Sequence, residues 1–290
     1  MDLEVEDVLQ IGNLLGEGPV WDSEKGLLFW VDIEEHCFHS MCPAAAVAVR
    51  KFDVGVPVYS LGLVAGSDKL VMATSRGFAL WNSPDGSLEA IADPEEGRPA
   101  GRLNDAAVDR QGNFWAGSLG PGFTSALYRL GPRRSVQKVE SGIGASNGIG
   151  WSPDNRTMYF TDTRHRVIFA YDFDASSSTV ANRRIWARVP EGEGVPDGLT
   201  VDSEGCVWSV RWGFARVARY DPTGRLEREI ALPVTYPTSC TFGGANLDEL
   251  YVTSARSPLS QSLAAREPCA GDLFRIGVGV RGIEEARFRE

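Results

Sequence analysis

The sequence predicts an all-β protein folded as a six-bladed β-propeller, and three observations support this. Short runs of β-branched and aromatic residues alternate with turns, and no long stretch keeps the period of a helix. The 32 glycines and 16 prolines are spread along the whole chain without a linker or low-complexity block. One motif recurs six times with a period in the forties. We expect residues 1–290 to form a single propeller domain.

The repeated motif is a polar residue, then small or apolar residues, then a valine or an aromatic residue four positions after the first. Six segments share it: Glu17–Trp21, Ser60–Val64, Asn104–Val108, Asn147–Trp151, Asp197–Val201 and Thr238–Phe242. Their first residues are 43, 44, 43, 50 and 41 positions apart. A period of this length, holding about four short strands, is typical of a propeller blade.

Each motif is followed, about ten residues later, by a turn and another β-type run. In chain order the expected strands are Leu28–Val31, Leu70–Ala73, Phe114–Ala116, Met158–Phe160, Val207–Val210 and Leu250–Val252. Turn-forming residues precede them, as in Asp22–Gly26, Asp109–Gly112 and Ser152–Asn155. The six units therefore share one register, which turns scattered through another all-β fold would not show.

The first residues of the six motifs are the candidate functional residues. Equivalent positions of the innermost strands of a propeller meet around the central channel. The expected ring contains Glu17, Ser60, Asn104, Asn147, Asp197 and Thr238. Carboxylates that converge at short range repel each other unless a proton or a cation offsets their charge. Such oxygen ligands suit a hard divalent ion, although polar residues bonded to backbone and water would fit a channel lining equally well.

Composition excludes several classes of function. The chain carries 29 basic and 39 acidic residues, a net charge of −10, so no nucleic-acid partner is expected. No apolar run approaches the roughly 18 residues of a membrane helix, and the acidic residues 1–7 do not resemble a secretory signal. Five widely spaced cysteines suit a reducing compartment. We expect a cytoplasmic protein with no membrane association and no obligate protein partner.

One cluster outside the ring has side chains that bind soft metals. It runs from His36 to Cys42 and contains His39 and Cys37. Its spacing matches no closed zinc pattern, and no second cluster exists to complete four ligands. A metal role there is not favoured.

Five sets of motifs occur in order at blade spacing, and together they resemble one known family. They are Gly16–Trp21 with Trp30–Ile33, Arg102–Asp105, Ser146–Gly148, Tyr159–Thr163 and Pro196–Leu199. The set is similar to the family of senescence marker protein (regucalcin), gluconolactonase and luciferin-regenerating enzyme, from Leu15 to about Phe274. The family's fold is a six-bladed propeller. The resemblance implies a metal-dependent lactonase that hydrolyses a sugar lactone to the aldonic acid, as gluconolactonase does.

The resemblance also implies roles for individual residues. Glu17, Asn147 and Asp197 match the family's metal ligands, and Asp197 also matches the general base. Arg102 and Asn104 match the pair that contacts the substrate, a small-molecule lactone. The expected cofactor is one divalent metal ion, with calcium first and zinc, manganese, magnesium or ferrous iron as alternatives. The chain departs from common family residues at Gly117–Leu119 and Trp212–Phe214, near the blade tops, which bears on substrate identity.

Other interpretations stay open. Arg102 could pair with Asp105 or Asp109 at the surface, and Asn104 could cap the turn before Asp105. A paraoxonase-like arylesterase would use the same architecture and a calcium ion, but usually with channel histidines, which this ring lacks. A non-enzymatic calcium-binding propeller would need no arginine and asparagine beside the carboxylates. A serine esterase is not expected.

Overall fold

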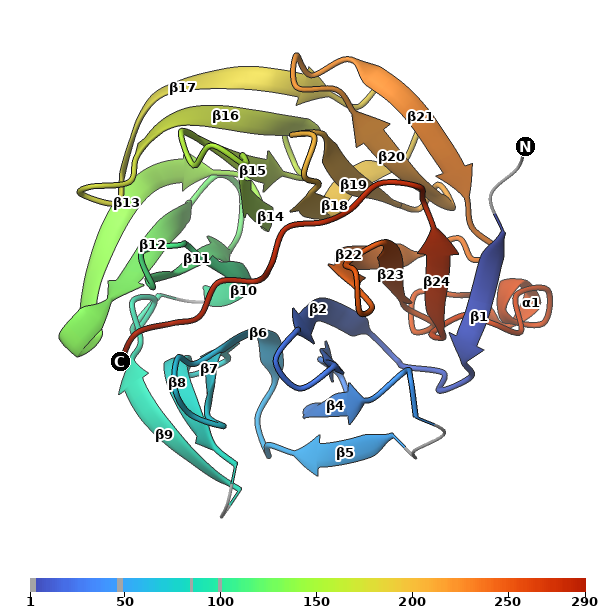
Figure 1. Cartoon of the computed structure of the whole chain (residues 1–290), viewed down its shortest axis with the longest axis horizontal. Helices are drawn as coiled ribbons and strands as arrows, with labels where there is room; N and C mark the ends of the chain where they lie inside the picture. The colour runs from blue at the N-terminus through green and yellow to red at the C-terminus, as the bar shows by residue number, and fades with distance from the viewer. Residues whose placement is uncertain (1–3, 46–48, 84–85, 99–100) are drawn as a thin grey trace.

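The fold is described from a computed structural model, for residues 4–45, 49–83, 86–98 and 101–290. These residues form six four-stranded sheets around a central channel (Figure 1). The prediction of a six-bladed all-β propeller is confirmed. Helix is confined, among the described residues, to α1 (Gln261–Ala264) and a 3₁₀ turn at Pro132–Arg134. No helix in these ranges is long and apolar enough to cross a bilayer.

Each blade is an antiparallel sheet whose first strand lines the channel. The innermost strands are β2 (Gly16–Asp22), β6 (Val58–Leu63), β10 (Arg102–Val108), β14 (Ser146–Trp151), β18 (Val195–Val201) and β22 (Pro237–Gly243). The second strands are β3 (Leu27–Asp32), β7 (Leu70–Thr74), β11 (Phe114–Leu119), β15 (Thr157–Asp162), β19 (Val207–Trp212) and β23 (Glu249–Ser254). All twelve contain or overlap the runs that the repeat predicts.

The outer half of each blade has two further strands. The third strands are β4 (Cys37–Met41), β8 (Gly77–Asn82), β12 (Ser125–Gly131), β16 (Val167–Asp174), β20 (Arg216–Tyr220) and β24 (Leu273–Gly277). The outermost are β5 (Arg50–Asp53), β9 (Ser87–Ala92), β13 (Ser135–Ile143), β17 (Thr179–Arg188), β21 (Leu226–Ala231) and β1 (Val5–Leu9). Because β1 pairs with β24, the first and last strands of the chain share the sixth blade and close the ring.

A repeated pair of side chains fixes the turn that leaves the channel. In blade three the indole Nε1 of Trp115 donates to Asp109 Oδ2 at 2.8 Å, and in blade five that of Trp208 donates to Asp202 Oδ2 at 2.9 Å. Each aspartate follows an innermost strand, and each tryptophan lies on the second strand. All four side chains are buried, so the bond satisfies polar groups that would otherwise be costly.

Every innermost strand has a β-bulge at or directly beside its ring position, where the register with the second strand shifts. In β10, two consecutive residues, Asn104 and Asp105, lie opposite Gly117. In β14 and β18 the corresponding second residue is a glycine. A Cβ on Gly148 would lie 2.4 Å from the Leu199 nitrogen, so only glycine fits there. A bulge changes the direction in which side chains point. Blade three therefore directs both Asn104 and Asp105 to the centre, whereas blades four and five each direct one polar residue there.

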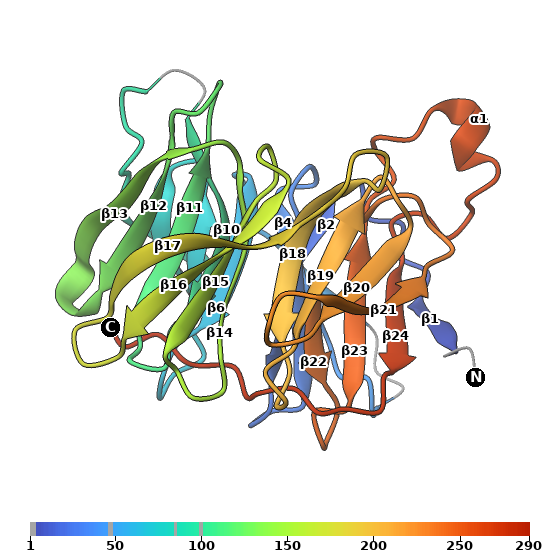
Figure 2. The same cartoon turned by 90° about the horizontal axis from the view of Figure 1, so that it is seen from above.

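After β24, residues 278–290, here called the C-terminal strap, cross one mouth of the channel (Figure 1), and Figure 2 shows them along one edge of the propeller. The Phe288 N–H donates to the Leu63 carbonyl at 2.8 Å, and the Arg289 N–H to that of Gly112 at 2.9 Å. These partners follow the far ends of the innermost strands, whereas the ring residues lie near their beginnings. A ligand would therefore reach the ring from the mouth opposite the strap.

The strap should contribute substantially to stability through Phe288, which is 0% exposed. We expect Phe288→Ala to lower the free energy of unfolding by about 3–5 kcal/mol, the usual cost of deleting a buried aromatic ring. Phe123→Ala is the matched control, because that ring is 53% exposed. Denaturant unfolding of both variants tests this. Equal, small losses would show that the strap adds little.

Candidate functional site

Four blades bring their ring residues together at the channel. Glu17 comes from β2, Asn104 from β10, Asn147 from β14 and Asp197 from β18. The charge of Asp197 raises the pKa of Glu17, and the charge of Asp105 raises the pKa of both Glu17 and Asp197. The two asparagines are joined by a hydrogen bond of 2.8 Å. Four of the six expected ring residues therefore lie near one another, and Asp105 lies beside them.

The three carboxylates are buried and poorly partnered. Glu17, Asp105 and Asp197 are 6%, 7% and 6% exposed. Glu17 Oε2 accepts the Gly18 N–H at 2.9 Å. In the part of the chain that the structure describes, Asp105 and Asp197 accept no hydrogen bond. Burying ionised carboxylates without partners is costly, so this arrangement calls for a compensating positive charge.

The pKa of each carboxyl is displaced in the direction that this cost predicts. Burial raises the pKa of Asp105 to about 7, although the nearby Arg102 opposes the rise. Burial also raises the pKa of Glu17 well above its usual value, and the charges of Asp105 and Asp197 add to the effect. The pKa of Asp197 is raised by burial and then by Asp105. These three carboxyl groups are therefore stabilised either by protonation or by a cation bound near them.

The raised pKa of Asp105 has a measurable consequence without any metal. An aspartate ionises near 3.8 in an unfolded chain and at about 7 here. Between these values the unfolded state releases its proton first, so ionisation makes Asp105 progressively destabilising as the pH rises. Melting of chelator-treated protein should therefore show Asp105→Asn gaining stability relative to wild type from about pH 4 to 7. A constant difference across this range would contradict the displaced pKa.

Arg102 is not a surface ion-pair partner. Its guanidinium carbon lies 4.0 Å from the centre of the Tyr59 ring, and Nη1 donates to Asn104 Oδ1 at 2.6 Å. Neither Asp105 nor Asp109 approaches it within ion-pair distance among the described contacts. That alternative interpretation is wrong, because the stack on Tyr59 and the bond to Asn104 hold the side chain beside the ring.

Asn104 does not cap the turn before Asp105. Its amide nitrogen donates to the Ser146 carbonyl and to Asn147 Oδ1, both at 2.8 Å. Asn147 Nδ2 donates in turn to Thr163 Oγ1 at 2.6 Å, and that hydroxyl donates to the Pro196 carbonyl at 2.7 Å. A continuous chain of hydrogen bonds therefore connects blades three, four and five.

The remaining ring positions are occupied by the protein's own bonds. Ser60 Oγ donates to the Ala106 carbonyl at 3.2 Å. Thr238 Oγ1 is fully buried and donates to the Gly16 carbonyl at 2.6 Å. The histidines lie elsewhere: His39 is stacked on Trp30 in the first blade, and His165 is bonded to Asp162. The hydroxyls of Ser60 and Thr238 are therefore both engaged in hydrogen bonds and are not free to act as reactive groups.

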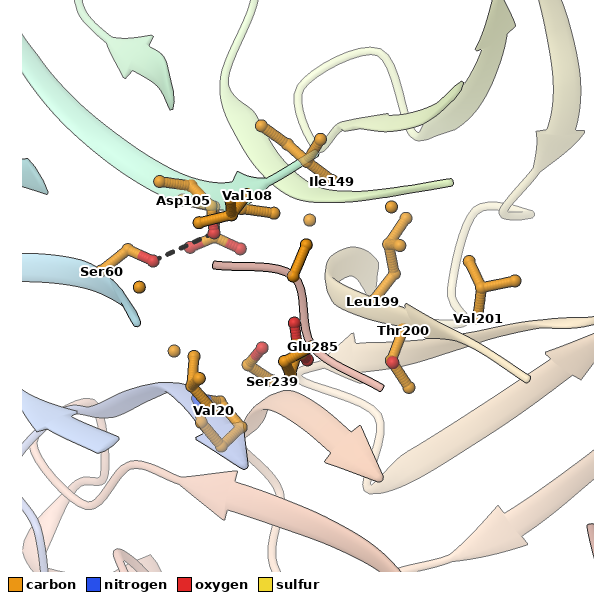
Figure 3. Close-up of a pocket in the computed structure, with 18 of the residues that line it drawn as sticks. Val20, Ser60, Asp105, Val108, Ile149, Leu199, Thr200, Val201, Ser239 and Glu285 are labelled. Atoms are coloured by element: carbon orange, nitrogen blue, oxygen red, sulfur yellow. Dashed lines mark hydrogen bonds between the residues drawn. The ribbon is translucent and has the colours of Figure 1, made fainter. Parts of the chain in front are cut away.

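A small cavity lies between the ring and the strap (Figure 3). Asp105 and Ser60 line it from the innermost strands, and Glu285 lines it from the strap. Burial raises the pKa of Glu285, whose Oε1 accepts from Thr241 at 3.1 Å.

The volume of this cavity is about 110 Å³, which is room for a few waters at about 30 Å³ each. It is below the 300–1,000 Å³ usual for small-molecule pockets. A larger ligand would have to bind on the open side of the ring.

Gly144–Gly148 fits the Gly-x-Ser-x-Gly pattern of serine esterases. The sequence therefore contains a nucleophile motif, and the surroundings of its serine decide whether it could react. Ser146 is 0% exposed, and its hydroxyl has no hydrogen-bond partner among the residues that the structure describes. It packs so tightly against Gly117 that a Cβ there would lie 1.5 Å from Oγ. A serine held in this way has neither a base nor access to a substrate.

Within the described part of the chain, two tight groups of potential metal ligands lie away from the channel. They are Asp7, Cys269 and Asp272, and Asp202, Glu204 and Cys206. The second is occupied by Arg219, whose Nη2 lies 2.7 Å from Asp202 Oδ2. The three central carboxylates do not form a group whose ligand atoms all lie within 4.8 Å of one another. The residues from His36 to Cys42 form no such group either.

Sequence reasoning missed three residues at the site. Tyr59 directly precedes a ring position and has no signal of its own. Thr163 belongs to the Tyr159–Thr163 motif, but the sequence assigns it no role because it follows the end of β15. Asp105 was considered only as a partner for Arg102. A signal for it existed: the residue after the ring position is glycine in blades one, four and five, but aspartate in blade three.

Comparison with known proteins gives a consistent result. Residues 15–256 match the family described as SMP-30/Gluconolactonase/LRE-like region. YvrE of Bacillus subtilis (strain 168), named as a candidate sugar lactone lactonase, is 34% identical over 283 residues, 95% of each chain.

Two solved structures resemble the whole chain. A luciferin-regenerating enzyme has a TM-score of 0.92 and 33% identity, covering 99% of this chain and 100% of its own. A calcium-binding protein, regucalcin, of Agrobacterium tumefaciens strain C58 has a TM-score of 0.94 and 28% identity, covering 100% of this chain and 99% of its own.

Proposed function

The chain belongs to the SMP-30/gluconolactonase/LRE-like family, and on that premise we propose that it is a metal-dependent lactonase. Its substrate would be a sugar lactone, hydrolysed to the aldonic acid as by a gluconolactonase. The name of the Bacillus relative supports a lactone as substrate, and that of the Agrobacterium regucalcin supports calcium as the ion.

The observation that supports this proposal best is the charge at the centre. Glu17, Asp105 and Asp197 are buried with little hydrogen bonding, and Arg102 is the positive side chain that acts on Glu17 and Asp105. With all three carboxylates ionised and Arg102 positive, the centre carries a net charge of −2. One divalent ion would balance it, which is why the proposed cofactor is a single ion. Buried charges are tolerated when they are paired in this way.

The spacing supports a division of roles among the oxygen ligands. An ion with bonds of about 2.4 Å spans about 4.8 Å between opposite ligands. The ligand atoms of the three carboxylates do not all lie within 4.8 Å of one another. The three carboxylates would therefore not all bind one ion directly. Because Glu17, Asn147 and Asp197 are the residues that match the family's metal ligands, we assign these three as ligands and Asp105 as a charge beyond them. A set of oxygens with water completing the shell suits calcium, which accepts six to eight ligands in flexible geometry.

The chemistry follows from these positions. A divalent ion bound here would polarise the lactone carbonyl and stabilise the oxyanion formed when water attacks. Asp197 would take a proton from the attacking water as the new C–O bond forms. It would return that proton to the ring oxygen as the old C–O bond breaks.

Arg102 and Asn104 are proposed to position the lactone oxygens. Arg102 uses Nη1 for Asn104 and for the Leu103 carbonyl, which leaves other guanidinium N–H groups for substrate. Both amide hydrogens of Asn104 are committed to Ser146 and Asn147. Asn104 would therefore contact substrate through the second lone pair of Oδ1, and Arg102 would be the principal donor.

A panel of substrates tests the proposal. Chelated protein refilled separately with calcium, magnesium, manganese, zinc or ferrous ion should hydrolyse sugar lactones, including gluconolactone, far faster than phenyl acetate. Faster hydrolysis of phenyl acetate would favour an arylesterase. Ion binding without hydrolysis of any lactone would favour a calcium-binding propeller.

The cellular setting proposed from the sequence is the cytoplasm. All five cysteines are free thiols, as suits a reducing compartment. The proposed partner is the small-molecule lactone alone.

A further inference from the structure

The hydrogen-bond chain beside the site has unambiguous ends. At one end is the guanidinium of Arg102, which can only donate. At the other is the carbonyl of Pro196, which can only accept. Between them lie Asn104, Asn147 and Thr163, joined by bonds of 2.6–2.8 Å.

These ends determine the orientation of both amides. Because the Thr163 hydroxyl has one hydrogen and gives it to Pro196, it must accept from Asn147. Asn147 therefore presents its NH₂ group to Thr163 and its carbonyl oxygen to the other side. Asn104 must likewise present its oxygen to Arg102 and its NH₂ group to Asn147. No alternative flip of either amide satisfies the chain.

We propose that Thr163 is a positioning residue for the ion centre: its hydroxyl orients the Asn147 amide so that Oδ1 is available to a divalent cation. A carbonyl oxygen has two lone pairs, so Asn147 Oδ1 can accept from Asn104 and still bind an ion. Thr163 also bonds to the peptide that carries Asp197. One hydroxyl thereby links two of the proposed ligands, from blades four and five.

Calcium titration of metal-free protein tests the proposal, which rests on the proposed function. Thr163→Val removes the hydroxyl at nearly constant volume, so that the Asn147 NH₂ group loses its acceptor and the amide is held only by the bond from Asn104. Its calcium affinity should fall by about 10- to 100-fold, the usual effect of losing a residue that orients a ligand. Thr163→Ser keeps the hydroxyl and should bind calcium like wild type.

The chain offers a matched control two residues away. Thr161 lies on β15 and is fully buried, whereas Thr163 directly follows that strand and is partly exposed. Among the described residues, the Thr161 hydroxyl has no hydrogen-bond partner. Thr161→Val should leave calcium affinity unchanged, so general damage to this strand is separated from the loss of orientation. Thr163→Ala removes the same hydroxyl with less bulk and replaces Thr163→Val if that variant does not fold.

The outcomes distinguish this proposal from the function on which it rests. Equal calcium affinity in wild type and Thr163→Val would overturn the positioning role alone. Equal losses in Thr163→Ser and Thr163→Val would overturn it too, because the hydroxyl would then not be the cause. Absence of calcium binding by wild type would instead overturn the ion centre itself.

Discussion

Replacing Asp197 by asparagine should lower kcat for lactone hydrolysis by roughly 10²- to 10⁴-fold, the range expected for loss of a general base. Asparagine keeps an oxygen that can bind the ion, but it cannot accept the proton of the attacking water. Bound metal should therefore remain measurable while turnover collapses. Steady-state kinetics and metal analysis on the same sample, at saturating calcium, separate the two effects.

Asp105→Asn is the informative control for that experiment. Both carboxylates are buried on bulges of innermost strands, and both have raised pKa values. Asp105 is assigned no proton transfer, so at saturating calcium its replacement should reduce kcat much less. A larger loss in Asp105→Asn would move the base to Asp105. Wild-type turnover in Asp197→Asn would leave Asp197 as a ligand only.

Replacing Glu17 by alanine should abolish tight ion binding, because it deletes an anionic ligand outright. We expect calcium affinity to fall by more than about 100-fold, beyond the 10- to 100-fold typical of residues that merely orient ligands. An ion that binds only the folded state stabilises it by mass action, by about 2.7 kcal/mol at 100 times Kd. Wild-type protein should therefore melt at higher temperature with calcium, and Glu17→Ala should show no such rise.

Asn104→Ala provides the comparison within the same ring. Asn147 would keep its orientation through Thr163, so the ion should stay bound. The expected defect is a higher KM, because Arg102 loses the acceptor that holds it; a fall in kcat instead would place the contact in the transition state. If Asn104→Ala loses calcium as completely as Glu17→Ala does, Asn104 is itself a ligand.

The architecture could be predicted because the repeat is explicit in the sequence. A shared register of polar residue, Val or aromatic residue, turn and strand indicates blades, and blade geometry then places Glu17, Asn147 and Asp197 around one axis. Only long-range symmetry is needed for this inference. No side-chain contact had to be known.

The finer structure of the site could not be predicted in the same way. The bulge that turns Asp105 inward depends on how β10 pairs with β11, which sequence spacing does not reveal. Thr163 lies outside the repeated segment, and its role appears only when the Pro196 carbonyl of the next blade is seen beside it. The strap that closes one mouth has no counterpart in the repeat. These features arise from contacts between blades.

The most direct test of the metal-dependent lactonase is to restore calcium to metal-free protein while following sugar lactone hydrolysis in the same sample. Hydrolysis should be absent at the start, rise in proportion to bound calcium and saturate at one ion per chain. That stoichiometry follows from three carboxylates balanced by one arginine and one divalent ion. Full activity in protein shown by metal analysis to be empty would contradict the account, as would saturation with calcium without hydrolysis.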